Sequence, residues 1–131
     1  MTGVRRALAA TLSAAVLAAG CVPAGEAAAR DAGEAFQAAL ADHDATAACR
    51  LLSDEARGSL ESASGKPCVQ SLPKLELPTG AVGQVEVWGD NGQVRLDSGV
   101  LFLARFKAGW KVTAAGCQPR QDKPYDCDVE G

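Results

Sequence analysis

The stretch VGQVEVWGDNGQVRLDSGVLFLARFKAGWKVTA, residues 82–114, decides the fold of this chain. Apolar and polar residues alternate within it in four short runs, which is the pattern of β-strands with one buried face. The runs are 82–88, 93–97, 100–106 and 110–114, and a turn containing glycine separates each from the next. Connections this short join antiparallel neighbours, so the stretch predicts a four-stranded antiparallel meander.

The residues before this stretch have a helical period. Apolar residues recur three and four positions apart over 28–42, which predicts an amphipathic helix. Asp44 is a suitable N-cap for a second helix over 45–52, and Ser53 could cap a third over 54–63.

Glycine and proline then end the helical region. Gly65-Lys66-Pro67 breaks it, and Pro73 and Pro78 predict an irregular connection over 71–80. Helices followed by a meander indicate the α+β class, with two or three helices packed on one face of the sheet.

The first twenty residues are typical of an export signal. Arg5 and Arg6 form a positive head without acids, residues 7–19 are almost entirely apolar, and Gly20 precedes Cys21. The apolar run would span roughly 20 Å as a helix, short of the ~30 Å hydrocarbon core of a bilayer. A permanent transmembrane helix is therefore the weaker interpretation.

The residues LAAGC at 17–21 resemble the bacterial lipobox, in which the cysteine is acylated and becomes the first mature residue. The resemblance predicts a signal peptide over 1–20, a lipid-anchored tether over 21–27 and one globular domain over 28–131, at the extracytoplasmic face of the cell membrane. Ala18 stands where the lipobox usually has leucine, so an ordinary signal cleaved near 27–29 remains an alternative. Paired arginines also leave the twin-arginine export route open.

Cysteine parity agrees with export. Setting Cys21 aside leaves four cysteines, Cys49, Cys68, Cys117 and Cys127, and an even number in a small exported domain predicts two disulfides. Of the three connectivities we favour Cys49–Cys68 and Cys117–Cys127, because each pair lies within one local region. No Cys-x-x-Cys pair is present and His43 is the single histidine, so we expect no metal site and no cofactor.

Charge excludes some partners. Two of the 13 basic residues lie in the leader, which leaves 11 against 16 acidic residues and a charge of −5 after residue 20. This balance argues against nucleic-acid binding and against attraction to an anionic lipid surface.

The order of motifs resembles a known family. Phe36-x-x-Ala39-Leu40-x-x-His43-Asp44 and Ala48-Cys49-x-Leu51-Leu52 precede a meander that ends in Gly109-Trp110-Lys111-Val112. This arrangement, over residues 28–114, is similar to the cone-shaped NTF2-like domains of many small actinobacterial lipoproteins. The resemblance implies a pocket between helices and sheet, which some members use for small molecules or catalysis and others replace with protein contacts. Its expected lining is Phe36, Leu40, Trp88, Leu101, Leu103 and Trp110.

No pattern in the chain predicts a reaction. His43 lies between two aspartates at a predicted helix junction, where we expect it to be exposed or to cap a helix. Glu86 and Asp97 are expected to point outward from their strands. We therefore predict a non-enzymatic binding or protein-interaction module of the cell envelope. The alternative is a pocketed domain that binds or transforms a small hydrophobic ligand.

Two observations would separate these functions. A cavity of ~300 Å³ or more would favour the ligand, and a filled core with an exposed aromatic patch would favour the interaction module. We expect Trp88 and Trp110 to be core residues that close the two ends of the sheet, although at a rim they would be anchors for a partner or ligand. The polar tail over 118–131 is expected to cover a sheet edge, and a contact surface is its alternative role.

Overall fold

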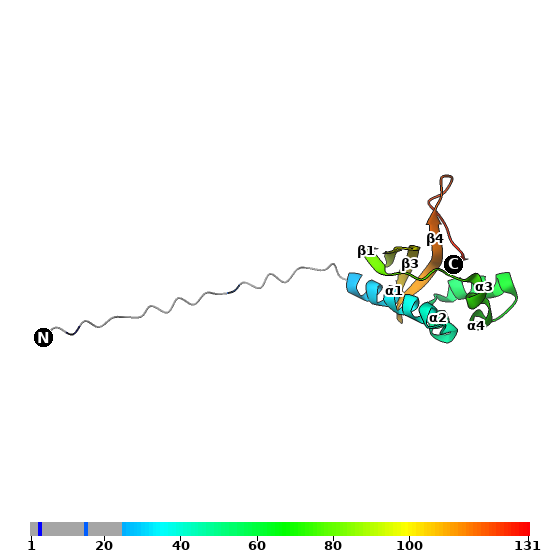
Figure 1. Cartoon of the computed structure of the whole chain (residues 1–131), viewed down its shortest axis with the longest axis horizontal. Helices are drawn as coiled ribbons and strands as arrows, with labels where there is room; N and C mark the ends of the chain where they lie inside the picture. The colour runs from blue at the N-terminus through cyan, green and yellow to red at the C-terminus, as the bar shows by residue number, and fades with distance from the viewer. Residues whose placement is uncertain (1–2, 4–14, 16–24) are drawn as a thin grey trace.

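The computed structural model describes residues 25–131, together with Gly3 and Ala15 (Figure 1). Cys21, the arginine pair and the rest of the predicted leader lie outside the described residues. None of the helices within 25–131 has the length and apolar character needed to cross a membrane.

Four α-helices and one 3₁₀ helix precede the sheet. They are α1 (Glu26–Ala41), α2 (Ala45–Leu51), α3 (Asp54–Ser64), α4 (Cys68–Ser71) and the 3₁₀ helix η1 (Leu72–Leu75). Both predicted caps are present, since Asp44 accepts from Ala47 N and Ser53 from Ala56 N, each at 3.1 Å. The expectation of two or three helices is too low, because Pro67 does not end the helical region but occupies the N-cap of α4.

The sheet has six strands. They are β1 (Val82–Trp88), β2 (Asn91–Leu96), β3 (Gly99–Phe106), β4 (Gly109–Pro119), β5 (Tyr125–Asp126) and β6 (Val129–Glu130). Every paired strand is antiparallel, in the order β1-β2-β3-β4-β5, and β6 also pairs with β4. The α+β class is confirmed, but the prediction of four strands is wrong because the tail supplies β5 and β6.

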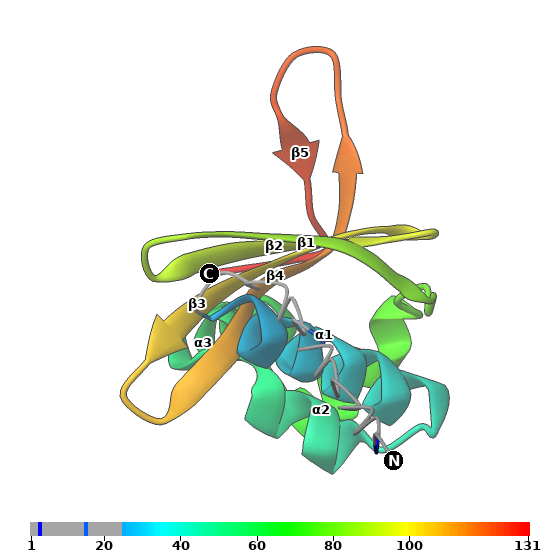
Figure 2. The ribbon, with the colours of Figure 1, turned by 90° about the vertical axis from the view of Figure 1, so that its left-hand side faces the viewer.

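β4 also continues five residues beyond its predicted end at Ala114. The β3–β4 register shifts between Val100 and Leu103, and Gly116 adopts a φ of 66°, a conformation that favours glycine. These irregularities bend β4 and interrupt its two-residue alternation. The alternation in the sequence therefore ends before the strand itself does. Beyond the bend the chain forms a β4–β5 hairpin that projects from the sheet (Figure 2).

The main core lies between the helices and one face of the sheet. Phe36 of α1 meets the inward residues of the strands, among them Val94, Leu101 and Leu103, and each of these side chains is almost completely buried. Trp110 is 8 % exposed in the same core.

A smaller core lies on the opposite face of the sheet, where the tail covers Phe102. The rings of Phe102 and Tyr125 meet edge to face, with centroids 5.0 Å apart, and Gln93 Nε2 donates to Tyr125 Oη at 3.0 Å. β6 covers the edge of β4, where Asp128 N donates to Ala115 O at 3.0 Å. The predicted edge-covering role of the tail therefore holds for β6, whereas the hairpin extends beyond the sheet.

Both predicted disulfides are present. Cys49–Cys68 joins α2 to α4 within the main core, and Cys117–Cys127 closes the base of the projecting hairpin. The four cysteines of the domain are thus fully paired.

Candidate functional site

The part of the expected pocket that lies beside Phe36, Leu40 and Leu101 is nearly filled. The space beside Phe36, Leu40 and Leu101, between α1 and the sheet, has a volume of about 10 Å³. A single water molecule needs about 10–15 Å³ of such space. Phe36, Leu101, Leu103 and Trp110 are thus core residues in this structure, and Leu40 is half-buried at the margin of the core.

Trp88 does not join the other expected pocket residues. It is 50 % exposed on the outer face of β1, which contradicts its expected place in a pocket or in the core. It also lies at the same end of the sheet as Trp110. Trp88 pairs with Asn91, Asn91 with Ala104, and Ala104 with Lys111, the residue next to Trp110. The alternation contains the signal for this placement: Val85 and Val87 mark the inner face of β1, and Trp88 falls on the other one.

An open cleft lies beside the filled interior. It has a volume of about 530 Å³ and is bounded by the end of α1, the start of α2 and the segment 72–79. Leu40, Leu72 and Leu77 give it an apolar floor, and His43 and Glu76 lie at its polar margin.

His43 and Glu76 share an unusual backbone conformation. Their φ angles are 54° and 49°, and among the described residues they are the non-glycine residues with positive φ. Such conformations cost of order 1–3 kcal/mol and cluster at functional sites. The presence of both residues in one cleft therefore makes this cleft a candidate site. Both residues are exposed, as predicted for His43, and both line the cleft that has the apolar floor, so the cleft offers an imidazole and a carboxylate to a small ligand that has a polar end.

Residues expected to point outward do so. Glu86 and Asp97 are exposed and lie outside the cleft. Within residues 25–131 no three His, Cys, Asp or Glu side chains gather in a manner that could hold a metal ion.

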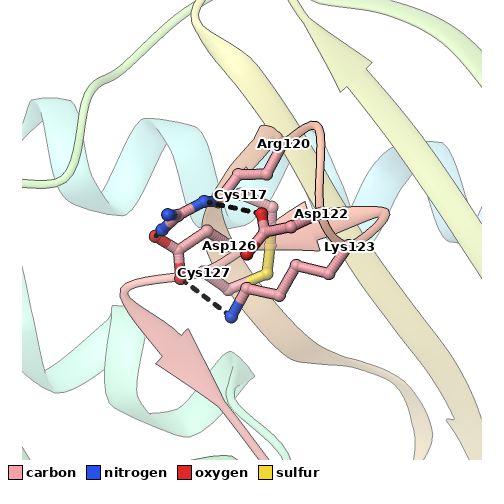
Figure 3. Close-up of polar contacts among 6 residues, drawn as sticks. All are labelled: Cys117, Arg120, Asp122, Lys123, Asp126 and Cys127. Atoms are coloured by element: carbon pink, nitrogen blue, oxygen red, sulfur yellow. Dashed lines mark hydrogen bonds and ion pairs between the residues drawn. A yellow bond between two sulfur atoms is a disulfide. The ribbon is translucent and has the colours of Figure 1, made fainter.

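The projecting hairpin carries a network of ion pairs (Figure 3). Arg120 contacts Asp126 at 2.8 Å and Asp122 at 3.5 Å, and Lys123 contacts Asp126 at 3.4 Å. The acids at 122 and 126 are therefore matched by two cations, so the hairpin is neutral and the excess acids of the tail, Asp128 and Glu130, lie after it.

The pKa of Asp126 is held below its ordinary value. Hydrogen bonds from Arg120 and then from Lys123 are the main causes, because both stabilise the carboxylate. A carboxyl group with a lowered folded-state pKa stabilises the hairpin above its unfolded pKa, and this contribution is lost as the pH falls through the folded-state pKa.

We expect Arg120→Gln to raise the pKa of Asp126 toward its ordinary value. Carbon-detected NMR titration of the Asp126 carboxyl group measures the shift directly. Arg57→Gln, which removes the 3.1 Å pair with Asp54 on α3, is the matched control and should leave Asp126 unchanged. An unchanged pKa in Arg120→Gln would show that the network is not formed in solution.

Comparison with models of known families, with curated proteins and with solved structures finds no match for this chain.

Proposed function

We propose that this protein is a lipoprotein anchored through Cys21 at the extracytoplasmic face of the cell membrane, with a non-enzymatic domain that contacts a protein of the cell envelope. The observation that carries the role of the domain is the small space, about 10 Å³, that remains between α1 and the sheet beside Phe36, Leu40 and Leu101. Ligand pockets are usually ~300 Å³ or larger, so the space between α1 and the sheet leaves no room for a substrate.

Cysteine pairing supports the proposed extracytoplasmic location and lipid anchor. Cys49–Cys68 and Cys117–Cys127 use every cysteine of the domain, and Cys21 is the odd one left over. Disulfides persist in oxidising compartments, and an unpaired cysteine behind an export signal is suited to acylation. α1 begins at Glu26, shortly after the proposed anchor.

The β4–β5 hairpin is the element that we propose for partner contact. Its base is fixed by Cys117–Cys127 and by Tyr125 on Phe102, and its tip extends clear of the sheet (Figure 2). A rigid, projecting hairpin loses little conformational entropy on binding, which favours affinity. The side chains of Arg120 and Asp122 at its tip are 48 % and 71 % exposed and can exchange their mutual pairing for charges on a partner.

We also propose that the domain is NTF2-like. The support lies in the order of its parts, because helices come first and an antiparallel sheet then packs its inner face against α1. The proposed relation concerns architecture alone, since one fold serves many functions.

A second function is favoured by one observation, the open cleft at His43 and Glu76. Its volume of about 530 Å³ is sufficient for a small ligand, and its floor is apolar. The alternative is therefore a domain that binds a small hydrophobic ligand at its surface rather than inside the cone.

One set of samples tests both parts of the proposal. Cells that express the full chain are labelled with a palmitate analogue, and we expect label and membrane association in the wild type and neither in Cys21→Ser. Ala18→Leu, which restores the usual lipobox residue, should label at least as well. Label retained in Cys21→Ser, or absent from the wild type, would refute the proposed anchor.

The purified lipoprotein is then heated with a library of metabolites and lipids. We expect no ligand to raise the melting temperature in a saturable manner. A ligand at 100 times its Kd would stabilise the protein by about 2.7 kcal/mol, which is readily detected. If such a ligand appears and Glu76→Gln abolishes its effect, the cleft function replaces the interaction module.

A further inference from the structure

The chain enters the domain at one end of the sheet. A Cβ atom placed on Gly25 would lie 3.3 Å from Trp110 Cζ2 and 3.7 Å from Val87 Cγ1. Both neighbours lie beside the tight turns that join β1 to β2 and β3 to β4. Figure 2 shows the start of α1 on the same side of the molecule as these two turns.

Arg105 joins the two turns. Its backbone N–H donates to Asp90 O at 2.7 Å, and its guanidinium donates to Asp90 Oδ1 through Nη2 at 2.6 Å and Nε at 3.0 Å. The guanidinium also lies 5.9 Å from the centroid of the Trp110 ring. The end of the sheet is therefore one connected structure, which we call the rim and define as Trp88, Asp90, Arg105, Phe106 and Lys107.

The rim presents two aromatic side chains to the surroundings. Trp88 is 50 % exposed and Phe106 48 % exposed, and among the described residues the one other large hydrophobic side chain that is exposed is Val69, at 44 %. Val69 belongs to α4, which lies at the far end of the domain from the start of α1 (Figure 1). The exposed aromatic surface is thus confined to the end where the chain enters.

We propose that Trp88 and Phe106 rest in the interfacial layer of the membrane to which Cys21 is anchored. This inference depends on the lipid anchor of the proposed function. Four residue steps separate Cys21 from Gly25 and span at most about 14 Å when fully extended. The anchor therefore keeps the rim within a short distance of the headgroup layer, which is roughly 5–8 Å thick. Tryptophan is enriched in that layer, because its ring combines an apolar body with a polar N–H.

Charge permits this contact. Glu26 and Asp90 lie at this end with Arg105 and Lys107, and Phe106 lines a hollow together with five further charged residues, Arg50, Asp54, Glu55, Arg57 and Lys111. Acidic and basic side chains are therefore mixed here, whereas the chain after residue 20 carries −5 in total. An anionic leaflet repels the net negative charge of the domain, and the basic side chains at this end offset that repulsion locally. The contact depends on apolar burial rather than on charge, so it requires no anionic lipid.

Seating the rim on the bilayer also leaves the hairpin accessible. β4 begins at Gly109 beside the rim and carries the chain to Pro119, where the hairpin starts. The proposed partner-binding element is thus separated from the membrane contact by the length of the longest strand.

Fluorescence quenching by brominated lipid tests the inference. The acylated full-length lipoprotein is reconstituted in phosphatidylcholine vesicles with and without bromine on the acyl chains close to the headgroup. Trp110 contributes a background that Trp88→Phe measures by itself. We expect bromine to reduce the Trp88 component about two-fold or more, because an interfacial indole lies within reach of the quencher.

A displaced reporter is the matched control. In Trp88→Phe with Val69→Trp, a tryptophan of similar exposure lies on α4, and bromolipid should leave its emission unchanged. Equal quenching at both positions, or none at Trp88, would overturn the inference.

Flotation of the same vesicles reports the anchor separately. Protein that floats with the vesicles while Trp88 stays unquenched refutes the rim contact and leaves the lipoprotein intact. Protein that does not float refutes the anchor, and the rim inference fails with it. Addition of phosphatidylglycerol should not increase the quenching, and a requirement for it would show that charge rather than the aromatic side chains drives the contact.

Discussion

Phe36→Ala is expected to lower the free energy of unfolding by about 3–5 kcal/mol, as measured by urea denaturation of the mature protein. Phe36 is completely buried and fills the space between α1 and the sheet. The void beside it is only about 10 Å³, so the neighbouring side chains are already closely packed. The truncation therefore creates a cavity. Removal of the ring therefore costs its transfer free energy and the cavity as well.

Phe106→Ala is the matched control for this prediction. The same side chain is removed from a position that is 48 % exposed, and we expect a change within about 0.5 kcal/mol. A loss below about 1 kcal/mol in Phe36→Ala would mean that the interior has room to spare. Such a result would weaken the argument against an internal ligand on which the proposed function depends.

The central architecture was predictable from local patterns. β1 has the bounds that the alternation predicts, 82–88, because Val85 and Val87 alternate with the polar residues Gln84 and Glu86 and a Gly-Asp turn follows. α2 and α3 begin where Asp44 and Ser53 indicate, since each side chain satisfies a backbone donor that the first helical turn leaves free.

The tail was not predictable in the same manner. β5 and β6 have two residues each, too few for any period to be visible. Their positions are fixed by distant partners, such as Phe102 under Tyr125 and Ala115 beside Val129. Non-local contacts of this kind leave no local signal. The sequence therefore predicted a polar tail that covers a sheet edge and carries a disulfide, but not the two strands within it.

The candidate sites also differ in whether local sequence patterns or non-local contacts determine them. Exposure of Trp88 follows from its place in the alternation, whereas the cleft at His43 and Glu76 brings together residues 33 positions apart in the chain. The loss of the expected pocket depends on how closely α1 approaches the sheet. At Gly33 a Cβ atom would lie 3.2 Å from Val94 Cγ1, and such a distance is set by packing rather than by pattern.

Loss of the Cys49–Cys68 disulfide is the second large effect. We expect Cys49→Ala with Cys68→Ala to lower the free energy of unfolding by about 3 kcal/mol, from the entropy that the unfolded chain regains across a separation of 19 residues. Domains of this size have total stabilities of about 5–15 kcal/mol, so a large share is lost. Both cysteines are also buried in the main core, and the loss should affect the whole cooperative unit.

Cys117→Ala with Cys127→Ala is the matched comparison, because the chemistry is the same and the separation is 10 residues. The chain-entropy model gives about 3 kcal/mol here too, but this pair belongs to the smaller core on the outer face. Hydrogen exchange should therefore show faster opening of residues 118–126 in this variant, with the helices still protected, whereas the first variant loses protection in α2 and α4. If the two variants exchanged alike, the hairpin would not be a separately closed unit, and its role as a rigid contact element would fail.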